Sequence, residues 1–317
     1  MQLLKVKDTE GKYLGQADPY ILKSGGKYYI YVTGHDGIYA YKSSLLLSGW
    51  EYYGRVLEVP GFKAFWAPSV IELDGKFYMY NSMELTDGQK DKSGHTGAMH
   101  VSVSENPLGP FTGTKQILPP FSIDSHIVKN EAGLFLFYST NRYEGKRCGT
   151  CIVVDKMKDP FTPEGNPVLV VEPTLDEEIF ERDRFKKGEH WHTIEGAFYF
   201  KEGPWQYVMY SGNCFEKPSY YIGYARAKTD ETDLTKIHFQ KYPDDDTYLP
   251  VLKANEFEEG TGHHSLIKED GIWYAVYHAR DYANTSGADS FDARNARICR
   301  LKVEDGIITA ERFEDHI

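Results

Sequence analysis

The sequence has no long apolar segment and little cysteine, and each of these absences excludes a class of protein. No apolar run approaches the roughly 18 residues that a membrane-spanning helix needs, so we expect no membrane partner of that kind. The leading MQLLKVKDTEG lacks the apolar core and small-residue cleavage site of a signal peptide, which predicts a cytoplasmic protein. Four cysteines in 317 residues are too few for a disulfide framework, so we expect ordinary reduced thiols.

Positive charge is also scarce, because the formal net charge is −11. Nucleic acids and anionic membrane surfaces are bound by basic patches, so neither is an expected partner. A neutral or weakly polar ligand is easier for such a chain to accommodate. The many aromatic residues are compatible with a homo-oligomer, which one sequence does not establish.

Aromatic residues and turn formers are abundant instead. The chain holds 24 Tyr, 17 Phe and 5 Trp beside 29 Gly and 15 Pro. Aromatic side chains fit a pleated, half-buried surface, and many short strands need many turns. Helical periodicity is almost absent, and only residues 175–187 indicate a short helix or a long loop. The composition therefore predicts an all-β protein.

One sequence frame occurs five times along the chain. It consists of a starting residue, two spacers, two apolar residues, a polar turn and an aromatic strand, and the copies start roughly 50 to 70 residues apart. The starting residues are Asp18, Ala67, Asp124, Glu195 and His263. Five such units predict a five-bladed β-propeller that occupies residues 1–317 as a single domain. Its ring closes either by a strand from MQLLKVKD or by packing alone.

The first strands of the blades line the axis of a propeller, so the five starting residues converge. Three carboxylates and an imidazole at one place indicate a site, because unpaired buried charge is costly. The alternative is that they bind a stabilising cation or the backbone at the pore. Two facing carboxyl groups are the minimum equipment for glycoside hydrolysis, and a third acid can raise the pKa of the proton donor. Phe65 and Trp66 could stack on a sugar ring or belong to the core.

Five short motifs, in order and over nearly the whole chain, resemble those of the family 43 glycoside hydrolases of the five-bladed propeller type. The motifs are Ala17-Asp18-Pro19-Tyr20, Trp66-Ala67-Pro68-Ser69, Ile123-Asp124-Ser125-His126, Ile194-Glu195-Gly196-Ala197 and Gly260-Thr261-Gly262-His263-His264-Ser265. The resemblance implies that Asp18 is the general base, Glu195 the general acid, and Asp124 the acid that raises the pKa of Glu195 and orients it. It also implies inversion at the anomeric carbon, which predicts roughly 6.5 to 9.5 Å between the carboxyl groups of base and acid.

The resemblance implies further site residues but no cofactor for the chemistry. In many members the histidine at the position of His263 faces a hydrated cation, often calcium, on the axis; the alternative is a pore histidine without metal. An arginine of the last blade commonly reaches the substrate, and of Arg280, Arg294 and Arg297 we favour Arg297. We expect His35 to line the same funnel, unless it is only a turn residue.

The resemblance also bears on the substrate, which we expect to be an arabino- or xylo-oligosaccharide. Gly-His-His-Ser followed by Val276-Tyr277-His278-Ala279-Arg280 looks most like α-L-arabinofuranosidases. Typical β-xylosidases of the family carry an added C-terminal β-sandwich. In this sequence only a short segment follows the fifth copy of the frame, so we expect no such sandwich. A cytoplasmic enzyme would trim imported oligosaccharides from the end. We therefore predict an exo-acting α-L-arabinofuranosidase, with β-xylosidase, endo-arabinanase and a catalytically silent sugar-binding propeller as alternatives.

Overall fold

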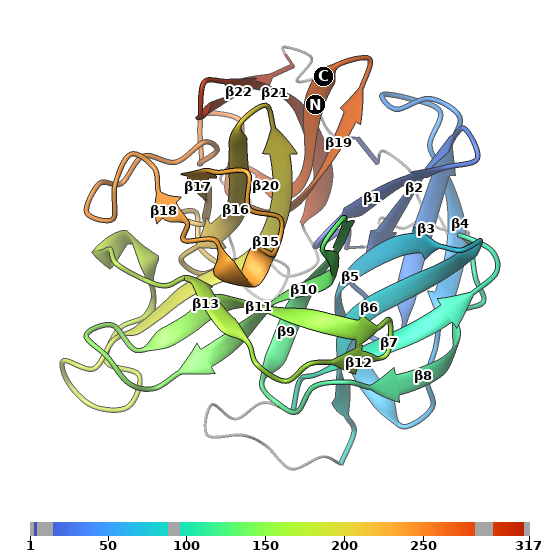
Figure 1. The fold of residues 1–317 in the computed structure, drawn as a ribbon, viewed down its shortest axis with the longest axis horizontal. Helices are drawn as coiled ribbons and strands as arrows, with labels where there is room; N and C mark the ends of the chain where they lie inside the picture. Colours follow the sequence, from blue (N-terminus) through green and yellow to red (C-terminus); the bar gives the residue numbers. More distant parts are fainter. Residues whose placement is uncertain (1–2, 5–14, 88–95, 283–293, 314–317) are drawn as a thin grey trace.

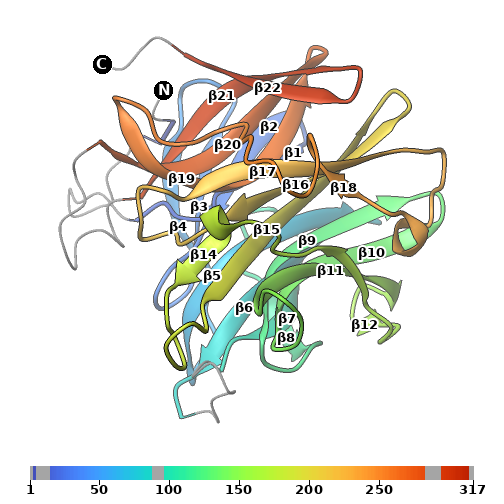
Figure 2. The same ribbon diagram turned by 90° about the vertical axis from the view of Figure 1, so that its left-hand side faces the viewer.

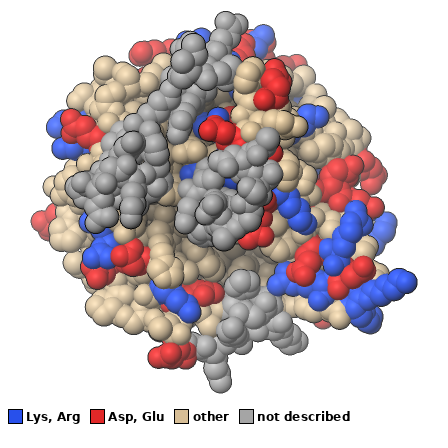
Figure 3. All heavy atoms as spheres, turned by 180° about the vertical axis from the view of Figure 1, so that it is seen from behind, with Lys and Arg blue, Asp and Glu red and all other residues tan. Residues whose placement is uncertain are grey.

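Five blades of antiparallel strands follow one another round a ring in chain order, and the third and fourth belong to one 10-stranded sheet (Figures 1 and 2). The computed structural model describes residues 3–4, 15–87, 96–282 and 294–313. The arrangement confirms the predicted five-bladed β-propeller. No helix in these described ranges is long and apolar enough to cross a membrane. On the face shown in Figure 3, acidic and basic side chains lie interspersed.

The blades are formed as follows, each from its inner to its outer strand. The first blade contains β1 (Tyr20–Ser24), β2 (Lys27–Val32), β3 (Ile38–Ser43) and β4 (Glu51–Leu57). The second contains β5 (Phe62–Leu73), β6 (Lys76–Leu85), β7 (Ala98–Ser104) and β8 (Thr112–Gln116). The third contains β9 (Ser122–Asn130), β10 (Gly133–Arg142) and β11 (Gly149–Asp159), with β12 (Thr162–Pro163) and β13 (Val168–Val171) paired to β11.

The last two blades also have four strands each, and the fourth has an added short strand. The fourth contains β15 (Trp191–Glu202), β16 (Trp205–Gly212), β17 (Tyr221–Lys228) and β18 (Gln240–Lys241), with β14 (Ile179–Glu181) paired to β15. The fifth contains β19 (Glu258–Glu269), β20 (Ile272–Asp281), β21 (Asn295–Glu304) and β22 (Ile307–Arg312). Two 3-10 turns, η1 (Asp176–Glu178) and η2 (Leu234–Lys236), lie in the connections. The segment 175–187 is therefore mostly loop, with η1 and β14 inside it.

Tight turns join the inner two strands of the blades. Ser24 pairs with Lys27 across Gly25 and Gly26, whose φ angles are 55° and 74°. The same two-residue turn is made by Asp270 and Gly271, with φ of 50° and 80°. Positive φ at both positions matches the right-handed twist of a hairpin and favours Asp, Asn or Gly. The polar turn of the repeated frame is thus a local signal for the hairpin of each blade.

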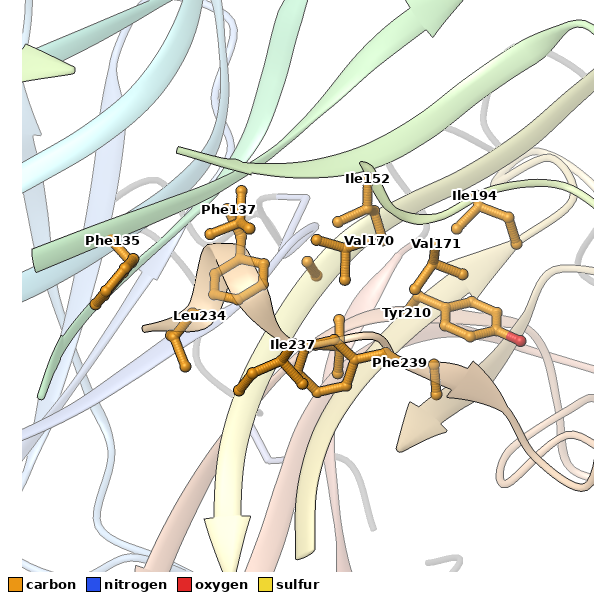
Figure 4. Close-up of a cluster of buried hydrophobic side chains, with 14 of the residues drawn as sticks. Phe135, Phe137, Ile152, Val170, Val171, Ile194, Tyr210, Leu234, Ile237 and Phe239 are labelled. Atoms are coloured by element: carbon orange, nitrogen blue, oxygen red, sulfur yellow. The ribbon is translucent and has the colours of Figure 1, made fainter. Parts of the chain in front are cut away.

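Apolar clusters fill the spaces between neighbouring blades. Figure 4 shows the cluster between the third and fourth blades, which contains Phe137 and Ile152 of the third blade and Ile194 and Tyr210 of the fourth. A parallel pairing of β11 with β15 also joins these two blades, and a Cβ on Gly149 would lie 2.0 Å from the carbonyl oxygen of His192. Only glycine permits that close approach. The packing between these two blades therefore fixes the start of β15, the inner strand of the fourth blade, against the start of β11.

The ring closes between the fifth and first blades by packing and by backbone hydrogen bonds. The N–H of Leu3 donates to the carbonyl of Ala296 at 2.8 Å, and that of Gln16 donates to Arg294 at 2.8 Å. Leu3 and Leu4 join a buried cluster that contains residues of both blades. The rest of the predicted MQLLKVKD strand lies outside the described residues.

Candidate active site

A cavity of about 290 Å³ opens at the axis where the inner strands of all five blades meet. It is lined by Asp18, Trp66, Phe121, Ile123, Asp124, Asn141, Thr150, Phe180, Arg184, Trp191, Thr193, Glu195, Phe215, Glu216, Tyr220, His263 and Arg294. The three acids, Trp66 and His263 that the sequence pointed to are thus brought together.

The other sequence candidates do not line this cavity. His35 lies exposed in a turn, and Phe65 is fully buried in the cluster between the first two blades. Arg297 is bound by Asp281 at 2.6 Å and lies 3.4 Å from Glu258, so its charge is taken up on its own blade. Placing Arg297, His35 and Phe65 at the cavity was therefore incorrect.

Of the three arginines considered, Arg294 reaches the cavity. Its NH1 lies 3.6 Å from Asp18 Oδ1, and its guanidinium lies over the ring of Phe215. Arg280 is fully buried and donates to the carbonyls of Phe215 and Glu216, which positions the loop on the same wall. Sequence spacing cannot separate these roles, because all three arginines lie in or directly next to the strands β20 and β21 of one blade.

A backbone feature explains how the site residues are aimed inward. Asp18, Ala67, Asp124 and His263 have φ between 39° and 56°, in the left-handed region that non-glycine residues adopt at a cost of about 1–3 kcal/mol. In the fourth blade the equivalent position is Gly196, with φ of 64°. Strand pairing is interrupted at these positions in β5, β9, β15 and β19, as in a β-bulge that re-aims a side chain.

This shifts the predicted frame by one residue in the fourth blade. Glu195 lies one position before the left-handed residue of its strand. Its equivalents are therefore Trp66, which precedes Ala67, and Ile123, which precedes Asp124; both also line the cavity. A Cβ on Gly196 would lie 3.2 Å from the His263 ring, so glycine is favoured there by space as well as by φ. In the third blade both positions, Ile123 and Asp124, line the cavity.

Asp18 is surrounded by groups that keep it ionised. Burial opposes its charge, yet the neighbouring His263, His278 and Arg294 hold its pKa well below the usual range. The hydroxyl of Thr33 donates to Oδ2 at 2.5 Å. Since burial lowers the pKa of His278 to about 4 and also lowers that of His263, Arg294 supplies the positive charge at neutral pH. Asp18 is thus a carboxylate throughout the neutral range.

Glu195 and Asp124 have the opposite tendency. Burial raises the pKa of Glu195 to about 7, and the charge of Asp18 adds to this effect. Burial also raises the pKa of Asp124 well above its usual value, with further contributions from Glu195 and Asp18. The N–H of Gly196 and the Ser139 hydroxyl bond Asp124. Environments that push carboxyl pKa values apart are how one site supplies both an acid and a base.

Tyr220 is a site residue that sequence reasoning missed. Its hydroxyl donates to Glu195 Oε1 at 2.7 Å, and its ring stacks on His278 with centroids 5.7 Å apart. Gly262 makes room for it, because a Cβ there would lie 1.9 Å from the tyrosine ring. The glycine of the Gly-His motif could have indicated that a side chain packs closely against Gly262. The sequence does not indicate which of the 24 tyrosines does so.

The donor set around His263 does not form a calcium cage. Calcium takes six to eight oxygen ligands, and Nδ1 of His263 instead lies 3.4 Å from Asp18 Oδ1. Within the described ranges no three His, Cys, Asp or Glu side chains gather as a metal site. A histidine-and-water site on the axis stays a prediction.

Comparison with known proteins gives consistent matches. The model of glycosyl hydrolases family 43 matches residues 14–308. The chain is 28% identical over 256 residues to an extracellular exo-α-(1→5)-L-arabinofuranosidase of Streptomyces avermitilis, which covers 75% of this chain and 47% of that protein. It therefore spans about half the length of that relative. It is 25% identical over 288 residues to xylosidase/arabinosidase 43A of Humicola insolens, covering 83% of this chain and 80% of that protein.

Solved structures agree in fold. A thermostable family-43 glycoside hydrolase matches with a TM-score of 0.78 and 30% identity, covering 98% of this chain and 96% of that chain. An α-L-arabinofuranosidase from Lactobacillus brevis matches with a TM-score of 0.76 and 22% identity, covering 98% of this chain and 97% of that chain. At that identity the second match speaks for the fold alone.

Proposed function

Because this chain belongs to family 43 of the glycosyl hydrolases, we propose that it is an inverting, exo-acting hydrolase that releases terminal α-L-arabinofuranose from arabino-oligosaccharides. The observation that carries the chemistry is the pair of carboxyl groups, of Asp18 and Glu195, that line one cavity. Asp18 is held ionised while the pKa of Glu195 is raised to about 7, so base and acid coexist near neutral pH.

The proposed reaction needs no cofactor. Asp18 takes a proton from a water, whose oxygen bonds to the anomeric carbon as the glycosidic bond breaks. Glu195 gives its proton to the departing oxygen, so one proton is taken up and one released. Asp124 accepts from the N–H of Gly196, the residue next to the acid. That Asp124 raises the pKa of Glu195 and orients it stays a prediction. The carboxyl separation expected for inversion stays a prediction.

The choice of sugar and mode is supported by the relatives and by the size of the cavity. The Streptomyces relative is named an exo-α-(1→5)-L-arabinofuranosidase. A cavity of about 290 Å³ lies at the small end of ligand pockets, which suits the end of a chain better than its middle. The Humicola xylosidase/arabinosidase favours β-xylosidase as the second candidate.

The test measures hydrolysis of the p-nitrophenyl glycosides of α-L-arabinofuranose and β-D-xylopyranose and of α-1,5-arabinobiose. We expect preference for arabinofuranosides and appearance of the inverted anomer first in the ¹H NMR spectrum. Glu195→Gln should lower kcat on arabinobiose about 10²–10⁴-fold, because general acid catalysis is lost. Preference for the xyloside would replace the sugar but keep the mechanism. Sugar binding without turnover in the wild type would replace the enzyme by a sugar-binding propeller.

We also propose where the protein acts and that it forms a homo-oligomer. We place the protein in the cytoplasm, where it would act on imported oligosaccharides, although the Streptomyces relative is named extracellular. Cell fractionation with an antibody against the protein tests this, and enrichment outside the cell would overturn it. A homo-oligomer is tested by sedimentation velocity.

A further inference from the structure

One wall of the cavity leads outward from the proposed acid along β15. Trp191, Thr193 and Glu195 are alternate residues of this strand, and all three line the cavity. Alternate residues of a strand share one face, and at about 3.3 Å per residue the row extends roughly 13 Å from the acid. A leaving group departs on the side of the general acid, so this wall borders its path.

Arg184 occupies this wall with its guanidinium held among aromatic rings. The guanidinium lies 5.0 Å from the centroid of Trp191 and 5.9 Å from those of Phe180 and Phe185. Trp191 is only 2% exposed, so its ring supports the arginine rather than offering an open platform for a sugar. The side chain of Arg184 is 16% exposed and lines the cavity.

The segment that carries Arg184 is anchored by a buried polar cluster. Glu178 is fully buried, accepts from Lys241 Nζ at 2.6 Å and from Tyr221 at 3.1 Å, and bonds the N–H groups of Thr174 and Leu175. The N–H of Arg184 itself donates to the carbonyl of Glu189 at 3.0 Å. A charged donor fixed in advance loses little freedom when a ligand binds.

We propose that Arg184 forms a leaving-group subsite, where its guanidinium donates hydrogen bonds to the hydroxyls of the sugar next to the scissile bond. The inference rests on the proposed function and adds a residue that selects for a sugar leaving group. Arginine presents several N–H donors in a rigid plane, which suits adjacent hydroxyls. The carboxylates of Glu181, 3.6 Å from Arg184 Nε, and of Glu216 on the lining disfavour an acidic sugar. The ligand is therefore a neutral sugar, and Trp191 is a positioning residue that acts through Arg184.

The test compares a sugar leaving group with a small one on the same terminal sugar. In Arg184→Met, kcat/KM for α-1,5-arabinobiose should fall about tenfold, mainly through KM, since hydrogen bonds from a charged donor are lost. The rate on methyl α-L-arabinofuranoside, whose leaving group carries no ring, should change less than twofold. Equal losses on both substrates, or no loss on arabinobiose, would overturn the inference.

Two further variants separate positioning from general damage. Trp191→Ala should reproduce the selective loss and Trp191→Phe should restore most of it, because a ring again supports the guanidinium. Arg300 is a matched control: it is exposed, its guanidinium lies 5.0 Å from the Phe313 ring, and it does not line the cavity. Arg300→Met should leave both rates unchanged. If the wild type prefers xylosides, xylobiose and methyl β-D-xyloside replace the two substrates. If the wild type cleaves neither the arabinosides nor the xylosides, the proposed function fails and this inference fails with it.

Discussion

Removing the hydroxyl of Tyr220 should move the alkaline limit of catalysis upward. The hydroxyl donates to Glu195 Oε1 at 2.7 Å, which stabilises the ionised carboxylate and lowers the pKa of Glu195 from what burial alone would give. A hydrogen bond to a charged group contributes about 1.5–3 kcal/mol, and one pKa unit corresponds to about 1.4 kcal/mol. In Tyr220→Phe the pKa of Glu195 should therefore rise by one to two units from about 7.

The assay is the pH dependence of kcat/KM on α-1,5-arabinobiose, whose leaving group needs the acid. A general acid must be protonated, so activity falls as pH rises through its pKa. The wild type should lose activity around pH 7, and the variant should keep a larger share of its own maximum at pH 8. Its maximal rate should fall, because the carboxyl group is less well oriented and is a weaker acid.

A matched control is Tyr80, which is fully buried and donates to the carbonyl of Pro160 at 2.7 Å away from the cavity. Tyr80→Phe loses a bond of the same length and should leave the pH profile in place. If the alkaline limb of Tyr220→Phe stays where it is or moves to lower pH, then Glu195 is not the acid or the bond does not tune it.

Two other perturbations test the same site through stability and packing. The folded-state pKa of Glu195 is raised from 4.5 to about 7, so its ionisation opposes folding above about pH 4.5. Glu195→Gln should therefore be about 3 kcal/mol more stable than the wild type at pH 8, and this gain should be gone at pH 4.5. Urea unfolding that showed equal stabilities for variant and wild type at both pH values would contradict a buried carboxyl group. Gly262→Ala would place a methyl group 1.9 Å from the Tyr220 ring, so most activity should be lost, whereas Gly25→Ala in an open turn should cost only about 1 kcal/mol from its φ of +55° and keep full activity. Thermal unfolding and arabinobiose assays that showed equal losses for the two variants would contradict this.

Much of the fold was predictable because its signals are local. Hairpin turns such as Asp270-Gly271 depend on two adjacent residues, and the aromatic strand after each turn carries its own pattern. Repetition of that unit then predicts a ring. Asp18 and Asp124 could be placed at the cavity for the same reason, since they begin two copies of the frame.

The predictions that failed depend on one-residue register or on distant partners. Glu195 fits the frame by letter count, but the left-handed position in its blade is Gly196, and only backbone angles reveal the shift. Arg297 was favoured over Arg294 because neighbouring positions of one blade look alike in sequence, although ion pairs with Asp281 and Glu258 hold Arg297 away from the cavity.

The sequence by itself determined the propeller, its five repeats and the acids that meet at the axis, because those follow from short-range pattern and from the symmetry it implies. Tertiary structure decided which groups tune these acids. Tyr220, Arg294 and Arg184 reach the cavity from connections between strands, and the pKa of Glu195 results from burial and charges contributed by several blades. Such effects sum over residues far apart in the chain, so no local pattern encodes them.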